Sequence, residues 1–462
     1  MFVKMQPTGR VANHGLNRLI VQRFRPGFAV LLMIVASSSS AATSPCPCEN
    51  PQWCEPISGP PVRESEVFGF YGSWVTPPQT AEVDLLRAKH GLRKLRLPIG
   101  NEMNWTHVTT VAWADRDEIM CLAHKHGARA ILGAPAIHLD ELSTPSARDE
   151  WIQNALLLVQ DSHRDGLVFD YEDPQPHGSI AGYVYAMLIS ETRDAFHAVN
   201  PSYQISTCVP WSPDGIDGRV YPYLQISAAS DLLYVMDYDT RSQIFDACLA
   251  GANAPLPGMI NGFQRWFDLG VDPSKLVLGV PWYGYRYPCL NGTAPNAVYC
   301  PIAEVPFRGV NCSDAAGREV MYSEIQKVLK SSDTALTGGV RRDSNTGSLF
   351  FNSIEKGKDK GNDCVETIYQ YWFDDPVSLA AKFTWARYHN LRGVGPYVFQ
   401  NLDPIGAPED ALAMWSTFDV FTYSASYGRL RRYQQTYMTM AWTMIMPLRD
   451  SSRKHKIDPR YL

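Results

Sequence analysis

The sequence has no apolar segment long enough to cross a membrane, little net charge and no evident internal repeat. Lys and Arg number 42 and Asp and Glu number 47, which gives a formal net charge of −5. So small an acidic excess gives no reason to expect a nucleic-acid partner. The apolar runs 27–36 and 437–448 are both shorter than the roughly 20 residues that a transmembrane helix needs. We expect a monomer that binds neither nucleic acid nor a membrane.

Residues 1–48 contain no acidic side chain, although they carry several Lys and Arg. The apolar run 27–36 follows this basic region, and small residues occupy 37–44. This order is typical of a secretory signal peptide, which we predict over residues 1–42. A mitochondrial presequence, or an upstream extra start before Met5, is the alternative.

All ten cysteines follow the predicted cleavage zone. An even number of cysteines behind a signal peptide favours disulfides, although the sequence does not define their pairing. Cys46, Cys48 and Cys54 could instead be metal ligands, but no fourth ligand lies nearby and we expect no metal. Three Asn-x-Ser/Thr glycosylation sequons fit the same compartment: Asn104, Asn291 and Asn311.

Candidate strands alternate with helix-like segments along most of the chain. Eight stretches are predicted as strands: 66–73, 93–98, 128–134, 165–172, 203–210, 231–238, 276–283 and 393–399. Helix-like segments lie between several of them: 148–163, 180–199, 258–269 and 376–390. This alternation predicts a parallel α/β protein, and eight strands are the number that closes a (β/α)8 TIM barrel.

The predicted barrel domain covers residues 43–416. An insertion of about 286–370 separates the last two strands and should form a small lobe or covering loop beside the mouth of the barrel. The remaining segment, 417–462, has eight Lys and Arg against three Asp and Glu. We predict a poorly ordered tail there, and the alternative is an artefact of gene prediction.

The segment from Asp165 to Glu172 (DGLVFDYE) places two carboxylates at the end of an apolar run. Because side chains two residues apart share one face of a strand, Val168, Asp170 and Glu172 should line up. Charged groups are rarely buried without a partner, so this arrangement favours acid/base chemistry. The alternative is a strand that simply ends in an acidic turn, since Asp173 follows at once.

Two acids this close on one strand cannot easily flank a glycosidic bond, as the carboxylates of most glycosidases do. Their spacing suits substrate-assisted catalysis, in which the acetamido oxygen of the substrate attacks. The Asp-Gly-x-x-x-Asp-x-Glu pattern resembles the signature of glycoside hydrolase family 18, the chitinase-like TIM barrels. Further segments that resemble members of this family are CPCxxxxxC at 46–54, WSPDGID at 211–217, VMDYDTRSQI at 235–244, LVLGVPWYGY at 276–285 and VPFRGVNCSDAAGR at 305–318.

The resemblance implies a role for three residues in catalysis. Glu172 would protonate the glycosidic oxygen, and like-charge repulsion from Asp170 should help keep it protonated. Asp170 would hydrogen-bond the acetamido nitrogen and stabilise the oxazolinium that forms. Tyr238 would hydrogen-bond the acetamido carbonyl. Such a mechanism requires no metal and no organic cofactor.

The resemblance also implies a set of sugar contacts near the ends of the last four strands: Trp211, Met236, Asp239, Trp282, Tyr283 and Tyr397. By residue type alone, Trp211 and Trp282 could equally be core residues. Asp239 could be a helix N-cap. Asp165 is expected to be architectural rather than catalytic.

Two positions depart from the family pattern. Val168 stands where many members carry Asp, and others Asn, so it cannot hydrogen-bond Asp170. Tyr397 stands where a Trp usually floors the sugar pocket. These changes keep open the alternative of a catalytically impaired sugar-binding protein.

The resemblance is strongest to members that cleave GlcNAc-β-1,4-GlcNAc in the chitobiose core of Asn-linked oligosaccharides, from the reducing end. It implies a glycosidase of the lysosome, with secretion as the alternative location. An endo-acting chitinase is a further alternative.

Overall fold

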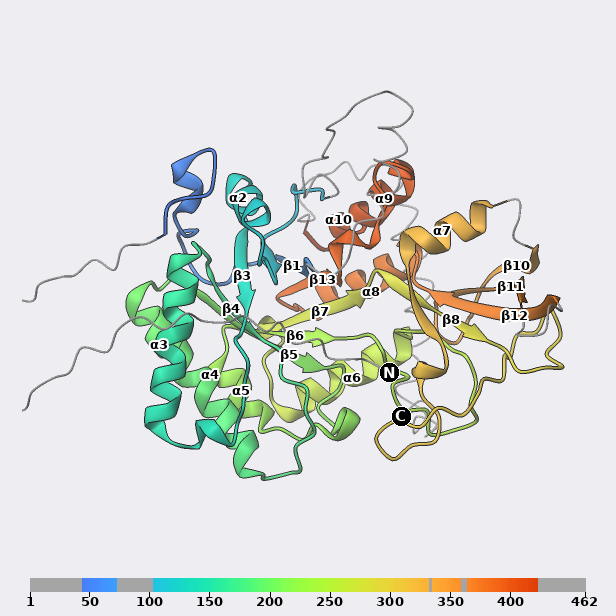
Figure 1. The fold of residues 1–462 in the computed structure, drawn as a ribbon, viewed down its shortest axis with the longest axis horizontal. Helices are drawn as coiled ribbons and strands as arrows, with labels where there is room; N and C mark the ends of the chain where they lie inside the picture. Colours follow the sequence, from blue (N-terminus) through green and yellow to red (C-terminus); the bar gives the residue numbers. More distant parts are fainter. Residues whose placement is uncertain (1–43, 73–102, 332–334, 359–363, 423–462) are drawn as a thin grey trace, which may run out of the picture. The chain divides into compact units, whose positions relative to one another are not determined.

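Eight parallel strands form a closed barrel in the computed structural model, which describes residues 44–72, 103–331, 335–358 and 364–422. Around the barrel the strands follow the order β1-β13-β7-β6-β5-β4-β3-β2. Their bounds are β1 Glu66–Phe70, β2 Thr110–Ala112, β3 Arg129–Gly133, β4 Gly166–Phe169, β5 Gln204–Pro210, β6 Leu232–Met236, β7 Leu276–Pro281 and β13 Gly393–Tyr397. The predicted TIM barrel is therefore confirmed (Figure 1).

Helices follow most of the strands and pack outside the barrel. They are α2 Asp117–Lys125, α3 Pro145–Asp161, α4 Ile180–Val199, α5 Tyr223–Ala229, α6 Leu256–Leu269, α8 Pro376–Tyr388, α9 Pro408–Trp415 and α10 Asp419–Thr422. Local sequence explains several starts, because Thr144, Ser179 and Asp375 each accept a backbone N–H of the first turn. Proline at the first position of α3 and α8 fits the same rule, since its missing N–H has no helical partner there.

The barrel strands are buried on both faces, so their two faces pack into separate apolar clusters. Residues such as Leu167 and Phe169 pack in the cluster shared with the helices. The alternate residues, among them Phe68, Val168 and Cys208, pack together in the barrel interior. This alternation follows from the two-residue period of a strand. It directs β4 residues of even number towards the interior and the mouth of the barrel.

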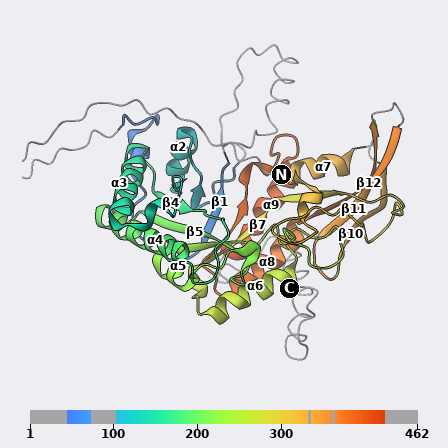
Figure 2. The same ribbon diagram turned by 60° about the horizontal axis from the view of Figure 1, so that its bottom comes forward.

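An antiparallel sheet is inserted between β7 and β13, with strand order β10-β11-β12-β8-β9. Its strands are β8 Tyr283–Pro288, β9 Arg318–Met321, β10 Ala335–Arg342, β11 Leu349–Lys358 and β12 Cys364–Phe373, and α7 (Tyr322–Lys330) follows β9. The sheet lies beside the barrel (Figure 2). The predicted insertion is confirmed as a folded lobe that begins a few residues earlier and ends a few residues later than expected.

Three sequence predictions need correction or lie outside the structure. The predicted strand 93–98 lies outside the described residues, and β2 holds the place between β1 and β3. Strand β4 ends at Phe169 rather than at Glu172. Residues 417–422, assigned to the tail, belong to the packed domain, because Phe418 and Phe421 are buried there. The rest of the predicted tail lies outside the described residues.

Four disulfides join eight of the cysteines: Cys46–Cys54, Cys48–Cys121, Cys248–Cys312 and Cys289–Cys300. The predicted use of cysteines in disulfides is confirmed, and the metal-ligand alternative for the first three is wrong because their sulfurs are bonded. Disulfides of this number indicate a protein of the secretory pathway. Among the described residues, no helix has the length and apolar character needed to cross a membrane.

Candidate active site

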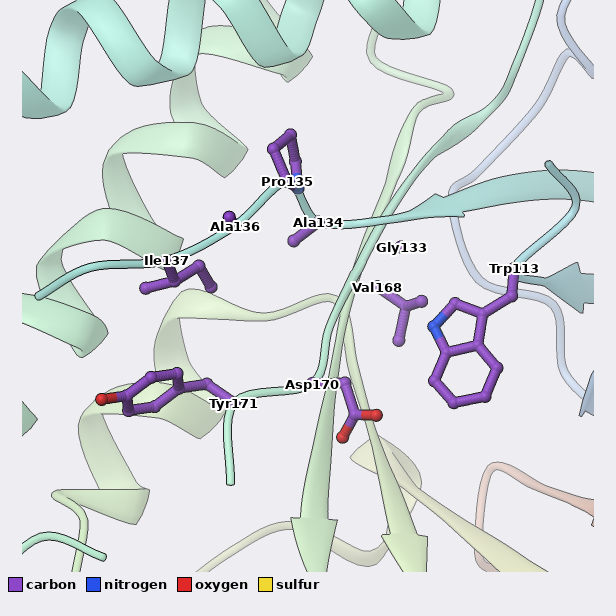
Figure 3. Close-up of a pocket in the computed structure, with 9 residues that line it drawn as sticks. All are labelled: Trp113, Gly133, Ala134, Pro135, Ala136, Ile137, Val168, Asp170 and Tyr171. Carbon is purple, nitrogen blue, oxygen red and sulfur yellow. The ribbon is translucent and has the colours of Figure 1, made fainter. Parts of the chain in front are cut away.

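Asp170 follows directly after β4, and its side chain lines a pocket at the ends of β2, β3 and β4. The pocket has a volume of about 200 Å³ and is lined by Trp113, Gly133, Ala134, Pro135, Ala136, Ile137, Val168, Asp170 and Tyr171. Val168 and Asp170 lie on the side of β4 that faces Trp113, whereas Tyr171 points the other way (Figure 3). Val168 and Asp170 therefore share one face, as predicted.

Burial raises the pKa of Asp170 to about 7, and the nearby Glu172 carboxylate also raises it. The Arg219 charge and the neighbouring Cys208 thiol act in the opposite direction. Oδ1 of Asp170 is buried and has no hydrogen-bond partner within the described part of the chain.

Glu172 lies beyond the end of β4, and its side chain is 53% exposed. Its Oε2 accepts a hydrogen bond from Nη1 of Arg219 at 2.5 Å. Arg219 also donates to Asp217 at 3.3 Å, and Asp217 accepts from the Ser242 hydroxyl at 2.7 Å. The raised pKa found in this pair is that of Asp170, and Glu172 lies beside a cationic partner, Arg219.

Three of the segments that carry the family resemblance meet at Glu172. Segment 211–217 supplies Asp217, and segment 235–244 supplies Ser242. Segment 305–318 supplies Arg308, which donates to the carbonyl oxygens of Asp217 and Glu172 at 2.6 Å and 3.3 Å. The inserted lobe thus helps to fix the backbone of Glu172.

Tyr238, which follows β6, is buried against other tyrosines at the mouth of the barrel. Its ring stacks on Tyr397 with centroids 5.2 Å apart and meets the edge of Tyr283 at 6.2 Å. Tyr397 also reaches Trp113, with centroids 5.8 Å apart, and so links this group to the Asp170 pocket. Met236 packs in the same interior cluster. Four of the predicted site residues are therefore brought together.

Asp239 lies next to this tyrosine group. Its Oδ1 accepts hydrogen bonds from the hydroxyls of Tyr283 at 2.6 Å and Tyr285 at 3.0 Å, and its backbone N–H donates to Asn253. Burial raises the pKa of Asp239 to about 6. The N-cap alternative is wrong, because Asp239 has a φ of 51° and no helix begins there.

The two tryptophans expected to contact sugar lie elsewhere. Trp282 is 0% exposed and packs against Phe399, Trp415 and Phe418. It is a core residue, so its assignment as a sugar contact is corrected. Trp211 packs against α6 at Gly262, where its ring and backbone occupy the space that a larger side chain would need.

Asp165 has the architectural role that was expected. Its Oδ2 accepts from the Ala130 backbone N–H and pairs with Nε2 of His124, both at 2.7 Å. Its Oδ1 accepts from the Ile57 N–H, also at 2.7 Å. These bonds connect β3, α2 and the N-terminal segment at the end of the barrel where β4 begins.

Sequence reasoning missed Arg219, Cys208 and Trp113. Arg219 lies two residues beyond WSPDGID, so the motif itself was a signal for it. Cys208 sits on a predicted strand in the register of Asp170, but a cysteine in a disulfide-rich chain drew attention only to pairing. Trp113 follows β2, a three-residue strand that was not predicted.

The barrel and its paired carboxylates define a class of protein, the TIM-barrel glycosidases. Residues 138–400 match the family described as "Glycosyl hydrolases family 18". The chain belongs to this family, as a glycosidase similar to di-N-acetylchitobiases.

Two curated relatives span most of the chain. "Probable di-N-acetylchitobiase 2" of Dictyostelium discoideum is 37% identical over 390 residues, which cover 82% of this chain and 92% of the relative. "Di-N-acetylchitobiase" of Homo sapiens is 35% identical over 384 residues, with 82% and 88% covered. Among solved structures, the Ostrinia furnacalis Group IV chitinase superposes with a TM-score of 0.57 at 18% identity, over 78% of this chain and 100% of that one. This structural likeness confirms the fold.

Proposed function

We propose that the protein hydrolyses GlcNAc-β-1,4-GlcNAc at the reducing end of oligosaccharides by substrate-assisted, retaining catalysis. The observation that carries the proposal is the difference in environment between the two acids. Asp170 is buried beside a pocket, and one of its oxygens has no hydrogen-bond partner among the described residues, whereas Glu172 is half exposed. A buried carboxylate suits an acetamido N–H, whereas an exposed acid can reach a glycosidic oxygen.

In this mechanism Asp170 accepts the acetamido N–H and aligns the carbonyl oxygen for attack on the anomeric carbon. The nucleophile belongs to the substrate, so the protein contributes positioning and electrostatic stabilisation of the oxazolinium. Tyr238 donates to the acetamido oxygen. Glu172 gives its proton to the leaving oxygen, then takes a proton from the water that opens the oxazolinium. The product retains its anomeric configuration.

The reaction needs one proton on the pair, and it must lie on Glu172. Burial raises the pKa of Asp170 to about 7, so Asp170 readily holds a proton at acidic pH before substrate binds. An acetamido N–H that donates to Asp170 favours its charged form, so substrate binding moves the proton to Glu172. The acidic and basic limbs of the pH–rate profile then report the two proton-binding steps of the Asp170–Glu172 pair, and neither limb reports one acid alone.

The substrate assignment draws on the named activity of the relatives, and the remaining sugar contacts are assigned by position. Asp239, Tyr283, Met236 and Tyr397 would line the subsite around Tyr238. Trp211 could contribute only through the part of its ring that α6 leaves open. The protein then binds GlcNAc-containing oligosaccharides as a monomer.

An acidic compartment such as the lysosome fits the buried carboxyl groups of the domain, although secretion stays the alternative. Burial raises the pKa of Asp170, Asp237 and Asp314 to about 7, so all three keep their protons more readily in the folded state. Asn291 and Asn311 are exposed and would carry glycans, as would the half-buried Asn104.

Product analysis tests the proposal. The purified chain is incubated with chitotriose and chitotetraose whose reducing-end oxygen carries an isotope label, and products are resolved by mass and anomer. Labelled single GlcNAc, with a β-anomeric partner product, supports the proposal. Internal cleavage would identify an endo-acting chitinase. Saturable sugar binding without turnover would identify a binding protein instead.

A further inference from the structure

Asp217 lies at the centre of a hydrogen-bond network that ends at Glu172. It belongs to the loop between β5 and α5 and is 8% exposed. Its Oδ1 accepts from the Ser242 hydroxyl at 2.7 Å, and its Oδ2 accepts from Nη2 of Arg219 at 3.3 Å. Arg219 in turn donates to Glu172 through Nη1 at 2.5 Å. Arg219 therefore stands between Asp217 and the proposed catalytic acid.

The loop around Asp217 has an unusual backbone that its contacts hold in place. Asp217 has a φ of 54°, in the left-handed region that Asp and Asn adopt more readily than other side chains. Gly215 and Gly218 also have positive φ, at 78° and 77°. The Gln175 N–H donates to the Gly218 carbonyl, and the Val220 N–H donates to the Gln175 carbonyl, both at 2.9 Å. These bonds fasten the loop to the segment that follows β4.

The inserted lobe supports the same two loops. Arg308 donates to the carbonyl oxygen of Asp217 at 2.6 Å and to that of Glu172 at 3.3 Å. The disulfide Cys248–Cys312 fastens the chain four residues beyond Arg308. Asp217 is therefore held through its carbonyl as well as through its carboxylate.

Glu172 has need of such support, because its side chain is 53% exposed. An exposed Glu samples several rotamers, whereas proton transfer requires its carboxyl within hydrogen-bond reach of the glycosidic oxygen. The Arg219 side chain is only 7% exposed, and its Nε donates to the carbonyl of Ile216 at 3.3 Å. A buried guanidinium that is held by Asp217 and Ile216 is a fixed anchor for the exposed acid.

We infer that Asp217 is a positioning residue, which fixes the guanidinium of Arg219 and thereby the carboxyl of Glu172. The reaction step assigned to Glu172 rests on the proposed function. In this role Asp217 acts through Arg219 and contacts no atom of the substrate. Its loss should therefore slow the chemical step and leave sugar binding almost unchanged.

Steady-state kinetics of the full chain, with each variant at its own pH optimum, test the inference. Asp217→Asn suits the left-handed backbone but offers one acceptor oxygen in place of two, so it can hold Ser242 or Arg219 but not both. It should lower kcat roughly tenfold and change KM by less than about twofold. Asp214→Asn is the matched control, because the exposed Asp214 lies in the same loop and pairs with Arg265 at 2.9 Å. It should leave kcat within about twofold of wild type.

A double-mutant cycle separates positioning from a general loss of structure. If Asp217 acts through Arg219, then Asp217→Asn should change kcat by less than about twofold once Arg219→Met is present. Equal losses in the two backgrounds overturn the inference and leave the proposed function standing. Should Asp217→Asn fail to fold, Ser242→Ala takes its place, because it removes one donor to Asp217 and no charge. Ser242→Ala should lower kcat roughly threefold, and an unchanged kcat contradicts the inference.

A second readout requires no turnover. In protein labelled with 15N-arginine, the guanidinium N–H signals of Arg219 are assigned by their absence from Arg219→Met. They should be protected from solvent exchange in the wild type, because both Nη atoms donate to carboxylates. Exchange should be roughly tenfold faster in Asp217→Asn and unchanged in Asp214→Asn. Fast exchange already in the wild type, or an unchanged rate in Asp217→Asn, overturns the inference even if the chain proves inactive and the proposed function fails.

Discussion

Replacement of Asp237 by Asn should remove much of the pH dependence of folding stability. Asp237 lies between Met236 and Tyr238, is 0% exposed, and neither carboxylate oxygen has a hydrogen-bond partner in the described part of the chain. Lys382 of α8 faces it but is already paired with Asp374 at 2.6 Å. The pKa of Asp237 is raised from 3.8 to about 7: burial is the main cause, Lys382 opposes it, and Asp374 adds to it.

The sign follows from proton linkage. The folded state holds the Asp237 proton more tightly than the unfolded chain, so the stabilisation is complete below the unfolded pKa of 3.8. It is lost as the pH rises through 3.8 towards the folded value of about 7. Between pH 4.5 and 7.5, this one group should cost the wild type roughly 3 kcal/mol of unfolding free energy.

Urea unfolding at these two pH values measures the effect. The difference in stability between Asp237→Asn and wild type should change by roughly 3 kcal/mol in favour of the variant from pH 4.5 to 7.5. Comparison of the same variant at two pH values cancels the pH-independent cost of burying an amide. Asp246→Asn, at an exposed loop carboxylate, is the matched control and should show little change. Parallel pH curves for wild type and Asp237→Asn would refute the reasoning.

Three further outcomes follow from the same contacts. Trp282→Ala should lower the unfolding free energy by roughly 3–5 kcal/mol, because it leaves a cavity among Phe399, Trp415 and Phe418. A variant with wild-type stability and an altered KM would show instead that Trp282 contacts the sugar. Arg219→Met should shift the basic limb of the pH–rate profile to higher pH by about one unit, because it removes the positive charge beside both acids. An unchanged limb would show that Arg219 does not affect the protonation of Asp170 and Glu172. Tyr238→Phe should lower kcat roughly ten- to hundredfold with little change in Tm, and a rise in KM alone would limit Tyr238 to binding.

The sequence was sufficient for the barrel because its strands have strong apolar patterns between helices with recognisable caps. It failed at β2, since three residues are too few for a periodicity to appear. The end of β4 was also misplaced: DGLVFDYE continues the alternating pattern beyond Phe169, but the hydrogen-bonded ladder stops there. Residues 417–422 were assigned to the tail on composition, although Phe418 completes the core around Trp282.

Within the site, the motif identified Asp170 and Glu172, but their protonation could not be predicted from spacing alone. The raised pKa of Asp170 comes mainly from burial, and the Arg219 charge that opposes it comes from another loop and meets the two acids only in the folded barrel. The same reason explains the error over Trp282: a tryptophan beyond a strand end can turn into the mouth or into the core, and only packing decides.

The central claim is that Glu172 supplies the catalytic proton to a GlcNAc-β-1,4-GlcNAc bond. The most direct measurement is hydrolysis of N-acetylated chito-oligosaccharides from pH 3.5 to 7 by the wild type, by Glu172→Gln and by Asp173→Asn, which changes the neighbouring exposed carboxylate. We predict that the wild type and Asp173→Asn release single GlcNAc from the reducing end. Glu172→Gln should bind the same sugar but lose at least about 100-fold in turnover. The account would be contradicted if Glu172→Gln turned over the substrate at the wild-type rate. It would also be contradicted if the folded wild type bound the sugar without hydrolysing it.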